Sequence, residues 1–371
     1  MSRFLFIEPF YGGSHKYFAD GLIQKSCHEI DLYSLPARFW KWRMRGASVY
    51  AVQHIKDLMR YEAIIVSNML SVSDFKALAG PDLPPVILYF HENQILYPLA
   101  EGETEDLHYG FTDFISALCA DSIIFNSEFH MKAFLKGIPP FLSRFPDFRP
   151  SSSIEKIQTK CQVIPPGCHL DPEPYIPVER PENPVIIWNH RWEHDKNPED
   201  FFEVLFELDS EGIPFSLAVL GERYTTSPEI FSIAEQKLKD RIIHFGYAEN
   251  YSDYKAILNS GNIVISTAFQ ENFGISIIEA IGSGNFPLLP NRLSYKEIIP
   301  EEFHKFCLYK NKKDLINKLK KLISHYDPQL LRKLVEKNKR YDWNQIIAQY
   351  DLYLEQKKNP VNRDFYQDLS I

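Results

Sequence analysis

The chain has few cysteines, no long apolar run and no excess of positive charge. Its five cysteines are scattered among 371 residues without CxxC spacing, which favours reduced thiols over a disulfide framework or a zinc site. No run approaches the roughly 20 apolar residues of a membrane span. The apolar run within residues 1–8 is too short for a signal peptide. These absences predict a cytoplasmic protein that is not bound to a membrane.

Two kinds of site are disfavoured by missing motifs. The HExxH and DxD patterns are absent, so neither a zinc site nor the acid pair of metal-dependent sugar transferases is expected. We therefore expect a site without a metal ion. The net charge of −8 argues against a histone-like affinity for nucleic acid, although it leaves room for a local basic patch.

Chain length and apolar patterning predict two α/β domains. A chain of 371 residues exceeds what one hydrophobic core usually serves. Short apolar runs typical of buried parallel strands recur in both halves, and a proline-rich stretch over 165–184 marks a linker. We expect two doubly wound, Rossmann-like domains facing a cleft. The expected strands are 4–7, 63–66, 86–90, 122–125 and 162–164, then 185–188, 216–220, 242–245, 263–266 and 286–289. Helices are expected over 14–25 and 107–118, and an irregular segment over 139–150.

Glu271 and Glu279 form the most informative pair in the chain. Glu271 lies in a Phe-Gly loop that follows the expected strand 263–266, and Glu279 lies in the helix that comes next. The first acid is thus at the C-terminal end of a strand, the usual ligand side of an open α/β sheet. The start of the helix favours a phosphate through its N–H groups and dipole. Together these features are typical of a nucleotide-sugar site.

Arg191 and Lys196 are two cations in the loop that follows strand 185–188, before a helix that begins near Pro198. Fixed cations at this place suit a diphosphate leaving group, whose charge grows as a glycosidic bond breaks. The pair taken alone is equally compatible with a solvated loop that carries surface ion pairs.

Two features of the first half are weaker candidates. Gly12 and Gly13 follow the first strand, and two glycines allow a backbone to approach a diphosphate, although a tight βα turn needs the same residues. His91 ends the strand 86–90, where a histidine is either functional or a hydrogen-bonded structural residue. The residues alone leave both alternatives open.

Residues 35–45 interleave cations with aromatic rings inside an acidic chain. Such a pattern suits phosphates and unstacked bases, as in a tRNA loop. It is also compatible with an amphipathic connector that buries its tryptophans. The candidate RNA-contacting residues are Arg38, Trp40, Lys41, Trp42, Arg43 and Arg45.

Taken together, these motifs resemble the retaining GT-B glycosyltransferases of family 4. Glu271 and Glu279 match the E-x7-E motif of that family, and Arg191 and Lys196 match its phosphate-binding cations. Three segments, 7–16, 40–43 and 89–94, resemble the tRNA-queuosine mannosyltransferases more closely. The resemblance implies a first domain over 1–178 that binds tRNA and a second over 179–342 that binds the nucleotide sugar. It further implies a helix over 343–371 that crosses back to the first domain.

The resemblance also implies a reaction and the residues that perform it. The reaction is transfer of mannose from GDP-mannose to the cyclopentenediol of queuosine, at the wobble position of aspartate tRNA. The implied catalytic residues are His91, Arg191, Lys196 and Glu271. The implied donor-binding residues are Gly12, Gly13, Arg191, Lys196, Asn272, Phe273, Gly274 and Glu279.

Three other functions compete with this expectation. The same fold acts on lipid or polysaccharide acceptors with another nucleotide sugar, which predicts an apolar surface with a basic rim. A glycosidase would use Glu271 and Glu279 as acid and nucleophile, roughly 5–10 Å apart, and would leave the cations unexplained. A binding module without catalysis would not need both acids and both cations.

Overall fold

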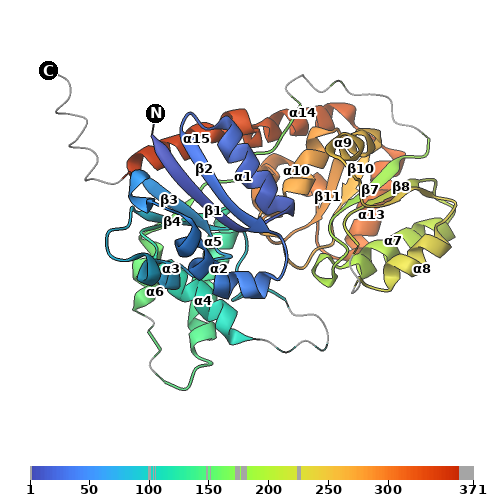
Figure 1. The fold of residues 1–371 in the computed structure, drawn as a ribbon. Coiled ribbons are helices and arrows are strands. Elements are labelled where there is room, and N and C mark those ends of the chain that lie inside the picture. Colours follow the sequence, from blue (N-terminus) through green and yellow to red (C-terminus); the bar gives the residue numbers. More distant parts are fainter. Residues whose placement is uncertain are drawn as a thin grey trace. The chain divides into compact units, whose positions relative to one another are not determined.

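The computed structural model describes residues 2–98, 102, 104, 106–147, 149–150, 152–171, 176, 182–223 and 227–358. The chain divides into two compact units, each built on a six-stranded sheet (Figure 1). Unit 1 comprises Met1–Leu99, Glu103–Gly167 and Trp343–Ile371, and unit 2 comprises Ala100–Gly102 and Cys168–Asp342. The expected linker over 165–184 lies partly outside the described residues.

The sheet of unit 1 is parallel, with strand order β2-β1-β3-β4-β5-β6. Its inner strands read as unbroken apolar runs because helices cover both faces. One face packs against α1 and α15, and the other against α2 to α6 (Figure 1). The strands are β1 (Arg3–Tyr11), β2 (Glu29–Pro36), β3 (Ala63–Ser67), β4 (Val86–Phe90), β5 (Ser122–Phe125) and β6 (Cys161–Val163). The helices are α1 (Gly13–Lys25), α2 (Trp40–His54), α3 (Val72–Ala79), α4 (Leu107–Cys119), α5 (Glu128–Leu142), α6 (Ser153–Gln158) and α15 (Trp343–Gln356).

The last helix, α15, completes the core of unit 1. The indole of Trp343 lies against Gly21 and Gly167, where an added Cβ would come within 2.2 Å of the ring in both cases. Any larger residue at either position would displace the indole. The hydroxyl of Tyr350 donates to the carbonyl of Ile164 over 3.0 Å.

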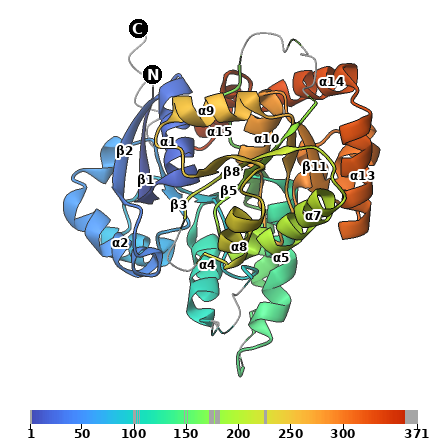
Figure 2. The ribbon, with the colours of Figure 1, turned by 90° about the vertical axis from the view of Figure 1, so that its right-hand side faces the viewer.

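The sheet of unit 2 is also parallel, with strand order β12-β11-β10-β7-β8-β9. The chain order reverses between β7 and β10, so the loops that follow these strands diverge at a switch point of the dinucleotide-binding kind. Helices α7, α8 and α13 lie on one side of the sheet, and α9, α10 and α14 on the other (Figure 2). The strands are β7 (Val185–Asn189), β8 (Ser216–Leu220), β9 (Ile242–Gly246), β10 (Ile263–Ile265), β11 (Phe286–Pro290) and β12 (Leu308–Tyr309). The helices are α7 (Pro198–Ser210), α8 (Ile230–Lys237), α9 (Tyr251–Ser260), α10 (Ile275–Gly282), α11 (Tyr295–Ile298), α12 (His304–Cys307), α13 (Lys312–Ser324) and α14 (Pro328–Asn338).

One local expectation was wrong. The segment 139–150 was expected to be irregular, yet Pro139 and Pro140 lie inside α5, which ends at Leu142. A proline removes one helical hydrogen bond and crowds the preceding turn. Here both prolines occupy the last turn of a helix whose capping residue, Ser127, is well placed to start it, because its side chain accepts from the N–H of His130. The apolar face of α5, including Phe134, Ile138 and Phe141, keeps that last turn on the core.

Candidate active site

The loops after β7 and β10 lie side by side at the switch point of unit 2. The N–H of Phe269 donates to the carbonyl of Asp195 over 2.7 Å, and the hydroxyl of Thr267 donates to the carbonyl of Asn197 over 2.7 Å. Asn197 adopts a left-handed conformation with φ 51° and caps α7. These bonds bring two distant predicted segments, 190–197 and 266–274, into one structure.

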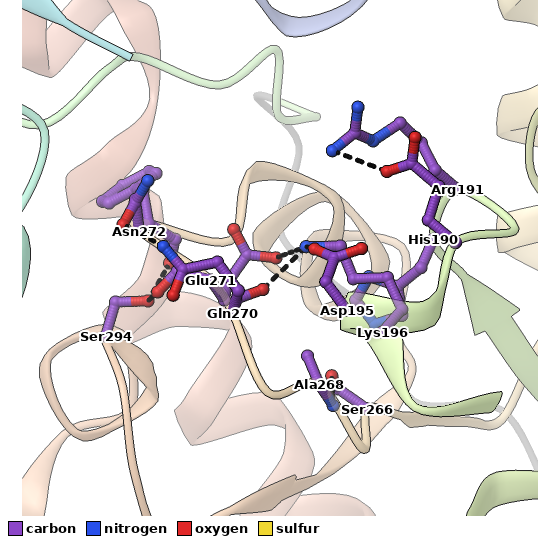
Figure 3. Close-up of polar contacts among 12 residues, drawn as sticks. His190, Arg191, Asp195, Lys196, Ser266, Ala268, Gln270, Glu271, Asn272 and Ser294 are labelled. Atoms are coloured by element: carbon purple, nitrogen blue, oxygen red, sulfur yellow. Dashed lines mark hydrogen bonds and ion pairs between the residues drawn. The ribbon is translucent and has the colours of Figure 1, made fainter. Parts of the chain in front are cut away.

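Lys196 is the centre of this site. It is only 8% exposed. Its ammonium lies 3.1 Å from Oδ2 of Asp195 and 3.6 Å from Oε2 of Glu271, and it donates to the carbonyl of Gln270 over 2.7 Å (Figure 3). Burial alone would lower the pKa of Lys196, but the carboxylates of Glu271 and Asp195 raise it above its usual value. Lys196 is therefore a fixed cation, and we call Asp195, Lys196 and Glu271 the Lys196 cluster.

Arg191, the second predicted cation, occupies a different environment in the same loop. It is exposed, and its guanidinium pairs with Oε2 of Glu193 over 3.0 Å (Figure 3). The two cations thus differ in rigidity, since a half-solvated arginine exchanges partners at little cost. The Lys196 side chain is the more buried of the two, with 10% of its surface exposed against 47% for Arg191.

The side chain of Ser294 holds the loop that carries Glu271. The hydroxyl of Ser294 lies 3.1 Å from the carbonyl of Glu271 and 2.9 Å from that of Phe273 (Figure 3). Gly274 follows with φ 103°, a conformation that strongly favours glycine, and α10 begins after it without a side-chain cap. The N–H groups of Ile275 and Ser276, at the start of α10, are therefore available to an anion, whereas that of Ile277 donates to the carbonyl of Gly274.

Glu279 lies within α10 and is 5% exposed. The hydroxyl of Tyr254 donates to its Oε2 over 2.8 Å, and the side-chain amide of Asn189 donates to the same hydroxyl over 2.9 Å. Burial first, and then the charge of Glu279, raise the pKa of Tyr254 well above its usual value. Tyr254 is therefore a permanent donor, and neither it nor Asn189 was identified from the sequence. The sequence signal for this polar network was the position of Asn189 at the end of an otherwise apolar strand.

In unit 1 the glycine loop follows β1. A Cβ at Gly12 would fall 2.4 Å from the Cβ of Ala37, whereas a Cβ at Gly13 would meet nothing within 4 Å. Gly12 is thus required by packing against β2. Gly13 adopts φ 51° at the start of α1 and faces open space, where backbone is accessible to a ligand.

His91 follows β4 and belongs to a buried cluster that the sequence did not reveal. Its Nε2 lies 3.2 Å from Oε2 of Glu8, and Nδ1 of His15 lies 3.2 Å from Oε1 of the same carboxylate. The two imidazole rings stack with their centroids 3.8 Å apart. We call Glu8, His15 and His91 the Glu8 cluster. The presence of Glu8 inside an otherwise apolar strand was the sequence signal that could have revealed this cluster.

The basic and aromatic segment, residues 35–45, includes the start of α2. Its predicted RNA-contacting residues differ in their exposure. Arg38, Lys41, Trp42 and Arg45 are exposed, and Trp42 is 64% accessible. Trp40 instead packs against Tyr109, with ring centroids 5.1 Å apart. Arg43 is half-buried and donates to the carbonyl of Pro36 over 3.2 Å. Phe39, which was not among the candidates, is 72% exposed beside them.

Two groups among the described residues have atoms placed for a metal ion. They are the Glu8 cluster and a second group of Cys27, His28 and Asp351. Metal independence therefore remains a prediction. The five cysteines are free, and among the described residues no helix is long and apolar enough to cross a membrane.

The predicted residues thus fall into two groups, one in each unit. Unit 2 brings Lys196 and Glu271 together and ties Glu279 to Tyr254. Unit 1 holds Gly12, Gly13 and His91 at the C-terminal ends of β1 and β4, and the exposed residues of α2.

Comparison with known proteins supports both the fold and a family. The chain is similar to the sucrose-phosphate synthase of Thermosynechococcus elongatus, with a TM-score of 0.72 and 14% identity over 96% of this chain and 99% of that one. It is also similar to HepE of Anabaena in complex with UDP and glucose, with a TM-score of 0.67 and 14% identity over 96% and 100%. With its two parallel six-stranded sheets, the chain has the predicted GT-B-like fold, so the fold class is confirmed.

Sequence comparison is more specific. Residues 3–168 match the family model of the tRNA-queuosine alpha-mannosyltransferase N-terminal region, and residues 174–341 match that of the group 1 glycosyl transferases. The tRNA-queuosine alpha-mannosyltransferase of Drosophila melanogaster is 38% identical over 320 residues, which cover 80% of this chain and 82% of that protein. The chain is a glycosyltransferase and belongs to the tRNA-queuosine alpha-mannosyltransferase family.

Proposed function

We propose that the protein transfers mannose from GDP-mannose to the cyclopentenediol of queuosine, at the wobble position of aspartate tRNA, with retention at the sugar carbon. Membership of the family carries this proposal, because the Drosophila relative is named a tRNA-queuosine alpha-mannosyltransferase; the donor nucleotide and the aspartate tRNA are what the family resemblance implies. As an enzyme that modifies tRNA, it acts in the cytoplasm. Unit 2 binds the nucleotide sugar and unit 1 binds the tRNA.

The arrangement in unit 2 suits a nucleoside diphosphate sugar. Lys196 is a buried cation and Arg191 an exposed one in the same loop, so together they balance the charge that grows on a departing diphosphate. The N–H groups at the start of α10 add a second anion site. Glu271 accepts hydrogen bonds from the sugar hydroxyls, and Glu279 accepts them from the ribose.

The chemistry needs no protein nucleophile. The bond between the sugar carbon and the diphosphate breaks, and the acceptor oxygen forms its bond on the same face of the sugar. The acceptor proton passes to the oxygen of the leaving phosphate. Catalysis then consists of positioning and of charge stabilisation by groups that are already in place. For His91 the family resemblance implies a role in holding the donor sugar.

The exposed face of α2 suits the acceptor. Arg38, Lys41 and Arg45 offer phosphate contacts, while Trp42 and Phe39 present rings to unstacked bases. Gly46 makes room for the indole of Trp42, because a Cβ there would lie 2.8 Å from it. Because the indole of Trp42 is already supported on one side, its side chain loses little conformational entropy when a base stacks on it.

Incubation of the protein with GDP-mannose and queuosine-bearing tRNA tests the proposal, with mass spectrometry of the released nucleosides. We expect a hexose mass increment on queuosine, and none on tRNA that lacks queuosine. A panel of GDP and UDP sugars identifies the donor, and a donor other than GDP-mannose would revise that part alone. Absence of any hexose on queuosine with every donor would refute the proposal.

A further inference from the structure

Glu8 is a fully buried carboxylate that accepts three hydrogen bonds and lies in ion-pair distance of a second imidazole, that of His15. It lies in β1 and is 0% exposed. Besides His15 and His91, each at 3.2 Å, the hydroxyl of Ser67 and the N–H of Phe10 lie 2.9 Å and 3.0 Å from Oε1. Burying an unpaired carboxylate is costly, so these donors account for its presence in the sheet. The cluster lies at the reversal of strand order between β1 and β3.

The geometry fixes where the proton of His91 is. An ionised carboxylate only accepts hydrogen bonds, so a ring nitrogen that is hydrogen-bonded to it must carry a proton. His91, whose Nε2 is hydrogen-bonded to Oε2 of Glu8, therefore holds its proton on Nε2. Burial and the neighbouring His15 lower the pKa of His91 to about 4, which leaves His91 neutral near pH 7. Its Nδ1 then carries the lone pair.

The backbone of His91 is held by two asparagine side chains. The N–H of His91 donates to Asn68 over 3.3 Å, and its carbonyl accepts from the side-chain amide of Asn126 over 2.9 Å. The other titratable groups that face the cluster are Tyr89 on β4 and His130 on α5. Burial raises the pKa of Tyr89 above its usual range and lowers that of His130 to about 3, so both stay neutral.

We propose that Glu8 is a positioning residue for sugar transfer. It holds His91 in the neutral Nε2–H tautomer at the end of β4. Through His15 and the N–H of Phe10, it also fixes the glycine loop that contains Gly12 and Gly13. The role of His91 beside the sugar rests on the proposed function, whereas the tautomer does not. One carboxylate thus links the ends of β1, β3 and β4.

A metal ion is the alternative occupant of the cluster, because ligand atoms of Glu8, His15 and His91 lie within 4.8 Å of one another. Nε2 of His91 either donates to Oε2 of Glu8 or ligates an ion, and the metal content of the protein distinguishes the two.

Long-range ¹H–¹⁵N spectra of histidine-labelled protein measure the tautomers without any need for transfer. We expect His91, assigned by its loss in His91→Gln, to be neutral with the proton on Nε2 at pH 7. In Glu8→Gln the donors Ser67 and Phe10 keep the amide oxygen at the position of Oε1, so the amide N–H faces His91 and its tautomer should reverse. A His91 that is cationic, or protonated on Nδ1, in the unaltered protein would overturn the proposal.

Kinetics supply the second readout. We expect Glu8→Gln to lower kcat by about 10²-fold, as when a histidine loses the carboxylate that sets its tautomer, with less than about a threefold change in the KM for GDP-mannose. Glu8→Asp keeps the charge and should restore part of kcat. Asp31→Asn, a carboxylate-to-amide change on neighbouring β2, is the matched control.

Each remaining outcome is decisive. Unchanged kcat in Glu8→Gln would overturn the proposal, as would one zinc ion per chain that survives dialysis and is lost in Glu8→Gln. If Glu8→Gln does not fold, the tautomer of His91 in the unaltered protein and the activity of Glu8→Asp still decide. Absence of transfer by the unaltered protein, with the expected tautomer present, would refute the proposed function and leave the assignment of His91 standing.

Discussion

Lys196 and Glu271 meet across the switch point of the unit 2 sheet, with Nζ 3.6 Å from Oε2, although they follow different strands. The separation is too long for a strong hydrogen bond and short enough for a firm charge interaction. Because no strong hydrogen bond joins the acid and the cation, one ligand group can contact both of them. The predictions below begin with this pair.

Glu271→Gln should abolish transfer while the protein stays folded. Lys196 keeps Asp195 as its partner, and the amide has nearly the same shape as the carboxylate. Loss of one preorganised group of this kind costs on the order of 10²–10³ in rate. Glu207→Gln is the control, because Glu207 also lies 3.6 Å from a lysine, Lys320, but on the surface. Near-normal turnover in Glu271→Gln would remove Glu271 from the site.

Lys196→Ala should lose stability as well as activity. The change leaves the buried carboxylate of Asp195 without its cation, and breaking a buried pair costs about 3–5 kcal/mol. Asp195→Asn added to Lys196→Ala should restore most of the free energy of unfolding and none of the transfer. Chemical denaturation and initial rates measure the two effects separately. If the double variant is no more stable than Lys196→Ala, Asp195 is not the source of the cost.

Tyr254→Phe should weaken donor binding more than it slows the reaction. The phenol donates to the buried carboxylate of Glu279, and a hydrogen bond to a charged group contributes roughly 1.5–3 kcal/mol. If Glu279 holds the ribose, the KM for the nucleotide sugar should rise roughly tenfold, with little change in kcat. Tyr341→Phe, which removes a hydroxyl bound to a carbonyl elsewhere in unit 2, is the control. An unchanged KM would separate Glu279 from donor binding.

Acid should destabilise the protein before most carboxylates titrate. Burial lowers the pKa of His130 to about 3. Between its ordinary value of 6.5 and about 3, the unfolded chain binds a proton that the folded chain does not. The free energy of unfolding should therefore fall by about 1.4 kcal/mol per pH unit, for this residue, as the pH drops below 6.5. His91 and His190, whose pKa values are also lowered by burial, act in the same direction.

His130→Gln should reduce that slope of stability against pH by about the same amount. His325→Gln, an exposed position in unit 2, controls for the substitution itself. Urea titrations at half-unit pH steps measure the slope, and an unaltered slope in His130→Gln would contradict the assignment.

Removal of the exposed cations of α2 should weaken tRNA binding in a salt-dependent way. With Arg38, Lys41 and Arg45 changed to alanine, the slope of log K against log salt should fall by about 2, while nucleotide binding survives. The control replaces three exposed lysines of unit 2, Lys310, Lys313 and Lys321, and changes net charge equally. Equal loss of affinity in both variants would make the effect one of total charge. Arg43→Ala should chiefly affect stability, because its guanidinium binds the carbonyl of Pro36.

Apolar runs located the sheets well because both faces of each sheet are covered. The expected strands 86–90, 122–125 and 216–220 coincide with β4, β5 and β8. β2 was missed because it is an edge strand with exposed and half-buried residues, so Glu29–Pro36 lacks the apolar signature. Helix α2 was missed for a similar reason, since its first turns are mostly exposed.

Only those site residues that belong to recognisable motifs could be predicted from the sequence. Glu271, Glu279 and Lys196 stand in recognisable spacings, and the structure brings Lys196 and Glu271 together. Glu8 and Tyr254 have no such spacing, because their partners come from other strands and helices. Contacts between distant segments depend on sheet order, which the sequence alone does not supply.

Unit 1 is assembled from both ends of the chain, and this has a consequence for biosynthesis. Residues up to Gly167 leave the ribosome before unit 2, whereas Trp343 and the rest of α15 emerge after it. Until then the face of the sheet that carries Phe4, Phe6 and Tyr89 lacks one of its two covering helices. Unit 1 is thus the first to begin folding and the last to finish, so a nascent chain stopped before Trp343 displays an open apolar surface to chaperones.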